Sequence, residues 1–269
     1  MAASANLLAF GLNTAVTFGL GTRGLLGAST NQQVSAALPT LATPAGWAFA
    51  IWGPIFMLEG GSMLWRLAGA SASDKAVVDA SSPAWCAACA LQAAWTAAFG
   101  FDQLALSVPL LGGISLALSS VYGTARSGLS GGAGSYVLGE LPFALHYSWT
   151  ALASLVNLNL LAVSMHAPAR AQVALAAASQ LGAVAFGVGE SWRRADPVPA
   201  FVASWALLAI SANDGVARTR ILTGAPQLGG QLELLTRAAG TMGKGLALFG
   251  AGMLLRNVLA RPAAGAKDP

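Results

Sequence analysis

The sequence predicts an all-α fold, a polytopic transmembrane bundle of about eight helices. Hydrophobic residues make up 55% of the 269 residues and charged residues only 9%. A soluble domain carries roughly 25% charged residues, so this chain has too little charge to cover a surface that faces water. Its glycine and alanine content is also high, as expected where helices pack closely in lipid through small side chains. We therefore expect an integral membrane protein.

Apolar windows of suitable length recur along the chain, and each predicts one membrane crossing. A helix needs about 20 apolar residues to cross the hydrocarbon layer. The windows that reach or approach this length are residues 5–22, 44–68, 84–101, 104–124, 139–165, 171–190, 197–213 and 239–257.

The connections between the windows support this division. Only residues 101–103 separate the third window from the fourth, which predicts a tight hairpin. The seventh window follows Asp196-Pro-Val-Pro199, a helix-start signal. The eighth contains Lys244 and many glycines, so a bundle of seven helices is the alternative. The more polar residues 23–43 and 214–238 predict loops, the second with a short amphipathic piece.

Lysine and arginine residues in the loops predict the orientation of the bundle. With eight crossings, one side collects eight of these residues and the other side five, which places both termini on the cytosolic or stromal side. No Lys or Arg precedes Arg23, so the first window predicts a retained helix rather than a secretory signal or a mitochondrial presequence. An upstream targeting peptide that is already removed stays an alternative, and the sequence leaves open which membrane holds the protein.

The net charge is +4, and its basic residues are scattered along the chain. Nucleic-acid binding requires a basic stripe or patch, so we expect no nucleic-acid partner and name membrane lipids and a hydrophobic small molecule instead. Cys86 and Cys89 have the spacing of a redox pair. They lack the strand–helix context of such a pair, which favours two small apolar residues on a helix.

Two ionisable residues inside apolar windows are candidates for function, because charge deep in a bilayer is costly. Glu59 lies well inside the second window; it either faces a polar group of a ligand or is satisfied by a neighbouring helix. His146 lies in the fifth window. It is a candidate axial ligand for haem iron or for chlorophyll magnesium, and the alternative is a hydrogen bond to a neighbouring carbonyl.

The fifth window also contains a candidate binding face. Trp149, Ala153 and Asn157 are spaced four apart and lie on one face of a helix. A small residue between an aromatic ring and an amide would leave a slot with apolar walls and one polar end, the composition of a small-molecule pocket. The alternative is that Asn157 links two helices through a hydrogen bond.

Four segments together resemble the TspO/translocator-protein family, and most closely its longer tryptophan-rich sensory branch. They are TPAGWAFAIWGPIF at residues 43–56, QAAWTAAF at 92–99, LPF with WTALASLVN at 141–157, and SWALLAI at 204–210. The second segment has Gln92 where the family has asparagine. The agreement in order and spacing extends over residues 43–213.

This resemblance implies a core of five helices around a pocket that accepts porphyrins and sterol-like ligands. It implies three parts of the chain: an additional N-terminal transmembrane helix and loop (1–43), a TspO-like core with an added helix (44–213), and a loop, C-terminal helix and disordered tail (214–269). Carried over residue by residue, it implies a pocket lined by Trp47, Trp52, Trp95, Phe99, Trp149, Ala153 and Asn157.

The residues and the resemblance together predict a non-catalytic membrane sensor or carrier for a tetrapyrrole or another flat hydrophobic ligand. No cofactor is expected to be required; porphyrin, haem, a chlorophyll-type pigment and a sterol or lipid are the candidate ligands. Slow porphyrin photodegradation is implied by the family only. The alternatives are a small-molecule transporter or channel, and a pigment-binding subunit of a larger membrane complex. A homodimer, common in the family, stays open.

Overall fold

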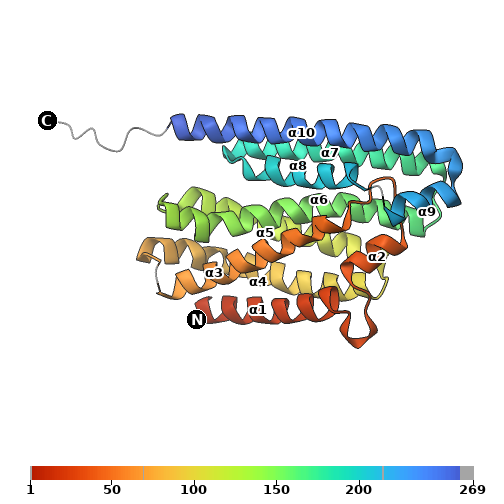
Figure 1. Ribbon diagram of the computed structural model, residues 1–269. Helices are drawn as coiled ribbons and strands as arrows, with labels where there is room; N and C mark the ends of the chain where they lie inside the picture. Colours follow the sequence, from red (N-terminus) through yellow and green to blue (C-terminus); the bar gives the residue numbers. More distant parts are fainter. Residues whose placement is uncertain (1, 69, 214, 261–269) are drawn as a thin grey trace.

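Helices that run side by side along one direction form the body of the protein (Figure 1). The computed structural model describes residues 2–68, 70–213 and 215–260, and within these ranges there is no β-strand. The lengthwise helices are α1 (Ala2–Val16), α3 (Trp52–Ala68), α4 (Ala72–Gly100), α5 (Leu104–Gly128), α6 (Leu141–Ser164), α7 (Ala169–Arg194), α8 (Val198–Ser211) and α10 (Gly229–Leu259). Two short helices, α2 (Asn31–Ala37) and α9 (Val216–Gly224), lie together at one end of the bundle (Figure 1).

Shorter turns extend several of these helices. A π-helical turn, Thr17–Thr22, continues α1, and a second one, Ser135–Glu140, leads into α6. A 3₁₀ segment, η3 (Gly46–Ile51), leads directly into α3. Two further 3₁₀ turns, Leu25–Gly27 and Pro226–Leu228, lie in the connections before α2 and α10.

The predicted all-α bundle is confirmed, and each of the eight apolar windows coincides with one lengthwise helix. Helix α3 begins at Trp52, after the 3₁₀ segment that opens the second window, and two other helices begin at least ten residues before their windows. Helix α4 begins at Ala72 rather than 84, because the Ser71 hydroxyl accepts the backbone N–H of Asp74 (3.1 Å) and caps an earlier turn. Helix α10 begins at Gly229, so that residues 229–238 are helical and not part of a loop. Leu232 and Leu235 in this extra stretch are buried, and their packing stabilises it.

Within the part of the chain that the structure describes, four helical stretches are long and apolar enough to cross a membrane by length and composition alone: Ala2–Thr22, Leu104–Gly128, Ala169–Arg194 and Pro226–Leu259. Helix α8 is apolar but shorter. That all eight lengthwise helices cross the membrane stays a prediction. The start of α1 and the end of α10 lie at the same end of the bundle (Figure 1), which agrees with an even number of crossings.

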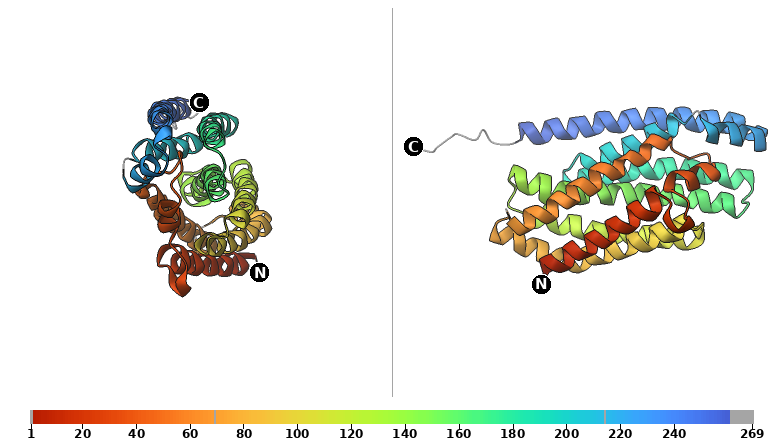
Figure 2. Two further views of the ribbon diagram at one scale, coloured as in Figure 1. Left: turned by 90° about the vertical axis from the view of Figure 1, so that its right-hand side faces the viewer. Right: turned by 60° about the horizontal axis from the view of Figure 1, so that its bottom comes forward.

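The helices are arranged so that α3, α4, α5, α6 and α8 occupy the middle. In the end-on view, α1 and α10 lie at opposite edges (Figure 2, left). Helices α4 and α5 form the predicted hairpin through residues 101–103. There Asp102 has a positive φ of 58°, and Gln103 N–H donates to the Ala98 carbonyl (2.8 Å).

Glycines allow α10 and α7 to approach α8 closely. A Cβ at Gly187 would lie 2.9 Å from the Cβ of Ala203, one at Gly243 would lie 2.9 Å from Leu208 Cγ, and one at Gly250 would lie 2.9 Å from Phe201 Cε1. This close approach lets the Ser204 hydroxyl donate a hydrogen bond to the Gly243 carbonyl across the α8–α10 contact (2.7 Å). In lipid, burial of apolar side chains does not drive helices together, because the lipid tails are apolar as well. Helices associate there through close contacts between small residues.

We predict that Gly187→Leu lowers the free energy of unfolding by about 1–3 kcal/mol, the usual cost of overpacking a core. The matched control is Gly189→Leu, because Gly189 lies on the same helix and a Cβ there has no heavy atom within 4 Å. Thermal unfolding in detergent, followed by tryptophan fluorescence, should separate the two variants. Equal melting temperatures would contradict the close α7–α8 contact.

Candidate ligand cavity

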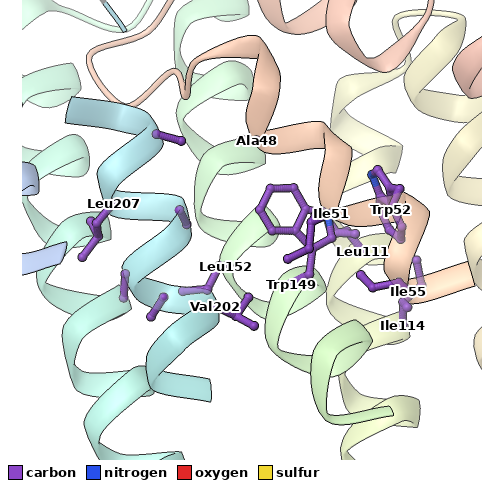
Figure 3. Close-up of a cluster of buried hydrophobic side chains, with 14 of the residues drawn as sticks. Ala48, Ile51, Trp52, Ile55, Leu111, Ile114, Trp149, Leu152, Val202 and Leu207 are labelled. Atoms are coloured by element: carbon purple, nitrogen blue, oxygen red, sulfur yellow. The ribbon is translucent and has the colours of Figure 1, made fainter. Parts of the chain in front are cut away.

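A narrow cavity of about 40 Å³ lies among α3, α4, α5, α6 and α8, with η3 and α2 at one end. Its walls are almost entirely apolar, and Figure 3 shows Trp52, Trp149, Leu111 and Leu152 around this part of the core. The residues that line it are Ser35, Pro44, Phe49, Trp52, Trp95, Phe99, Leu111, Trp149, Leu152, Ala153, Val156, Asn157, Leu160, Ala206 and Ile210.

Trp52 is the centre of the aromatic wall. Its ring lies 6.3 Å from the ring of Trp95 on α4 and 6.3 Å from the ring of Trp149 on α6, at interplanar angles of 35° and 89°. Trp95 in turn stacks on Phe99 with ring centroids 5.1 Å apart. These separations fall within the roughly 4.5–7 Å range of favourable aromatic pairs. Three helices are therefore joined by rings that present both faces and edges to the cavity.

Two of these indoles carry an N–H group that no described residue accepts. The Nε1 atoms of Trp95 and Trp149 are buried and have no hydrogen-bond partner among the described residues. Buried polar groups in folded proteins are nearly always paired, and an unpaired buried donor costs about 1–3 kcal/mol. Both donors belong to residues that line the cavity.

Asn157 lines the cavity but also connects two helices. Its amide Nδ2 donates to the hydroxyl of Ser107 on α5 (3.0 Å), and both residues are buried. The helix-linking role considered for Asn157 is therefore present in the structure. Its carbonyl oxygen is the part of the side chain left to face a ligand.

Glu59 and His146 form a buried pair behind the aromatic wall and do not line the cavity. Glu59 Oε1 lies 2.6 Å from His146 Nδ1, and their side chains are 0% and 1% exposed. The imidazole contacts Trp52 edge-to-face, with ring centroids 5.4 Å apart. The pair thus fixes one side of Trp52. His146 Nε2 has no partner, and no group of three or more His, Cys, Asp or Glu that could hold a metal occurs among the described residues.

Trp47 lies outside the cavity. Its side chain is 44% exposed and packs edge-on against Trp205 of α8 with ring centroids 4.6 Å apart. The Trp205 indole N–H donates to the Ala48 carbonyl (3.1 Å) and so holds η3 against α8. The 3₁₀ winding of η3 turns Trp47 away from the side that Trp52 faces, and sequence spacing does not reveal this.

Several lining residues were not predicted. Phe49 lies within the tryptophan-rich segment and Ala206 and Ile210 within the last motif, so the same motifs could have suggested them. Ser35 and Pro44 precede the core helices and come from α2 and the connection after it. Pro44 is the second residue of the tryptophan-rich segment, so this motif could have suggested it. No pattern in the sequence points to Ser35, because α2 reaches the cavity only through tertiary packing.

The family comparison agrees with this geometry. The model of the TSPO-like protein family matches residues 3–229, most of the chain. The chain belongs to the TSPO-like family. The match includes all the helices that line the cavity. Neither the curated proteins nor the solved structures include a significant match.

Family membership, together with the apolar helices, identifies this TSPO-like protein as an integral membrane protein. It also supports a general role in binding or sensing at the membrane. The ligand and the residues that contact it require the further argument given below.

We predict that Glu59→Leu destabilises the protein by about 3–5 kcal/mol, the cost of removing one partner of a buried ionisable pair. The double variant Glu59→Leu with His146→Leu should lose less, because an apolar replacement of both partners leaves no unpaired group. Unfolding free energies from denaturant titration of the purified protein test this ordering. A double variant as unstable as the sum of the two single variants would contradict it.

Proposed function

We propose that this TSPO-like protein is a sensor or carrier that binds a flat hydrophobic ligand, such as a tetrapyrrole, between Trp52, Trp95 and Trp149. The observation that carries the proposal is the set of three indole rings lining a largely apolar cavity, two of which, Trp95 and Trp149, have a buried N–H group without a partner among the described residues. A ring with acceptor atoms at its edge would stack on the indoles and accept both bonds.

The source of the binding energy follows from the membrane setting. A ligand that arrives from the bilayer leaves an apolar solvent, so burial of its surface gains little. Aromatic pairs add about 0.5–1.5 kcal/mol each, and a hydrogen bond formed by a group otherwise unpaired adds about 1 kcal/mol or more. Selectivity then depends on how flat the ligand is and on where its acceptor atoms lie relative to the two indole N–H groups.

The closed cavity requires a change of shape when a ligand enters. Its volume is about 40 Å³, whereas sites for small molecules typically measure roughly 300–1,000 Å³. The aromatic side chains must therefore move apart on binding. A ligand that favours the open arrangement shifts the population towards it, and this shift is a physical basis for sensing.

The rival functions have less support. A channel or transporter for polar solutes needs a continuous polar path, and among the described residues that line the cavity only Ser35 and Asn157 are polar. Magnesium or iron ligation by His146 in a pigment-binding subunit stays a prediction, since its ring does not line the cavity. Porphyrin photodegradation would use the same tryptophans and needs no separate site.

The first test removes the tryptophans. Trp95→Ala with Trp149→Ala should abolish binding of protoporphyrin in proteoliposomes, measured by the emission of the porphyrin itself. Trp95→Phe with Trp149→Phe keeps two rings but no N–H donor, and the loss should be about 30-fold for two bonds of ~1 kcal/mol each. Trp192→Ala is the control, because Trp192 is 66% exposed on the outer surface. Wild-type affinity in the Ala double variant would refute the assignment.

The second test reduces the space in the cavity beside Ala153. Ala153→Leu adds bulk to a residue that lines the cavity and should weaken porphyrin binding at least tenfold while the protein stays folded. Ala171→Leu, on the exposed side of α7, is the matched control. Binding that is equally strong in both variants would place the ligand elsewhere.

A further inference from the structure

A second group of buried polar side chains lies behind the aromatic wall. Glu59, Ser62 and Arg66 of α3 are spaced three and four residues apart and so lie on one face of the helix; they are 0%, 0% and 4% exposed. Glu59 pairs with His146 of α6. The Arg66 guanidinium lies 5.1 Å from the centre of the Phe143 ring, also on α6. The polar face of α3 is therefore turned toward α6.

Gln92 adds α4 to the same group, and its side chain is 0% exposed. The charges of Glu59 and Arg66 both act on the thiol of Cys89, one turn earlier on α4. This face of α4 is therefore turned toward the polar face of α3. We define the polar site as Glu59, Ser62, Arg66, Gln92 and His146.

Helix α1 forms a further wall of this compartment, since it lies against both α3 and α4 (Figure 2, left). The ring of Phe10 lies 6.2 Å from the ring of Phe56 on α3 and 6.4 Å from that of Trp85 on α4. The Asn6 amide donates to the hydroxyl of Ser82 on α4 (2.8 Å). The polar site is thus enclosed by α1, α3, α4 and α6.

Most polar atoms of the site have no partner in the part of the chain that the structure describes. They are Glu59 Oε2, Ser62 Oγ, Arg66 Nε and Nη1, Gln92 Nε2 and Oε1, and His146 Nε2. Buried polar groups are nearly always paired. If all of these stayed unpaired, their cost would be comparable to the entire net stability of an ordinary domain. A molecule that bonds to them therefore belongs to the folded state.

The occupant has to satisfy donors and acceptors at once. A guanidinium only donates and a carboxylate only accepts, so an anion would be repelled by Glu59 and a cation by Arg66. Water both donates and accepts, and a buried water molecule makes about three hydrogen bonds. We propose that the polar site holds a few water molecules, which join the Glu59–His146 pair to Arg66 and bring protons to the pair.

The two ends of the site differ. Arg66 lies in the last turn of α3, and its charge interacts with that of Asp79, an exposed residue of α4, so this end is next to the surface of the bundle. At the other end His146 contacts Trp52 edge-to-face. The site therefore ends at the back of the aromatic wall and does not cross the bundle.

The pair has a free position for one more proton. With Glu59 ionised, its carboxylate only accepts, so His146 Nδ1 carries a proton and Nε2 has a free lone pair. A hydronium ion in the site would transfer its proton to Nε2 and become water. The other ionisable groups near the pair are Arg66 and Cys89; residues 2–16 of α1 include none, and Tyr147 of α6 packs toward α7.

The first experiment uses two buried methionines. Met63 lies next to Ser62 and one turn from Glu59 on α3, and Met253 lies on α10; they are 2% and 4% exposed. In phosphatidylcholine proteoliposomes, hydroxyl radicals made from water by an X-ray pulse oxidise side chains next to water, and mass spectrometry measures the rates. Met63 should be oxidised at least fivefold faster than Met253. Equal rates would overturn the inference.

A pair of variants ties this result to the site. Gln92→Leu removes an amide that binds water and should slow the oxidation of Met63 at least twofold. Gln180→Leu is the matched control, because Gln180 is a buried glutamine on α7 whose amide donates to the Leu235 carbonyl (3.2 Å). Slowing of Met63 by the control alone would count against the polar site.

The second experiment compares the only two histidines of the chain. Exchange of the imidazole C2 hydrogen for deuterium requires both a proton and water at the ring, and mass spectrometry follows it in the unmodified protein. His166 is exposed at the end of α6 and gives the reference rate. His146 should exchange within about tenfold of that rate, although it is 1% exposed. No exchange at His146 while His166 exchanges fully would overturn proton access.

Neither experiment needs a bound ligand, so the inference is independent of the proposed function. A protein that binds no porphyrin could still show fast oxidation of Met63 and exchange at His146. Conversely, dry behaviour of both residues would remove the hydrated site and leave the aromatic cavity untouched.

Discussion

The packing of Trp52 against Trp95 and Trp149 is the interaction on which the middle of this protein depends. It joins α3, α4 and α6 through large rings rather than through the small residues that join α7, α8 and α10. The cavity lies at this point of the bundle, and these rings form much of its wall.

The polar groups within the bundle fall into two kinds. Some are paired between helices, as in Asn157 Nδ2 with the Ser107 hydroxyl and Glu59 Oε1 with His146 Nδ1. Others, the indole N–H groups of Trp95 and Trp149 among them, are buried without a partner. The hydrocarbon layer of a membrane contains no water that could accept a hydrogen bond from an unpaired donor. Both of these indoles belong to residues that line the cavity.

The segment before the core, residues 23–43, has a structural role that its polar composition does not predict. Residues 23–43 are polar and were expected to form a loop, yet they contain α2, which is capped at Thr30 by a reciprocal pair of hydrogen bonds with Gln33. This helix brings Ser35 to the cavity. The N-terminal part of the chain thus covers the end of a site that the core helices build.

The sequence by itself determined the helical class, the number of lengthwise helices and the identity of the central tryptophans. In a membrane, backbone hydrogen bonds must close within each segment, so composition along the chain is enough to predict helices, and motif spacing is enough to place Trp52, Trp95 and Trp149 on them. Only the tertiary structure decided which faces meet. It turned Trp47 outward through the 3₁₀ winding of η3, paired Glu59 with His146 across 87 positions of sequence, and extended α10 by packing Leu232 and Leu235. These outcomes depend on contacts between distant segments, and local pattern carries no information about such contacts.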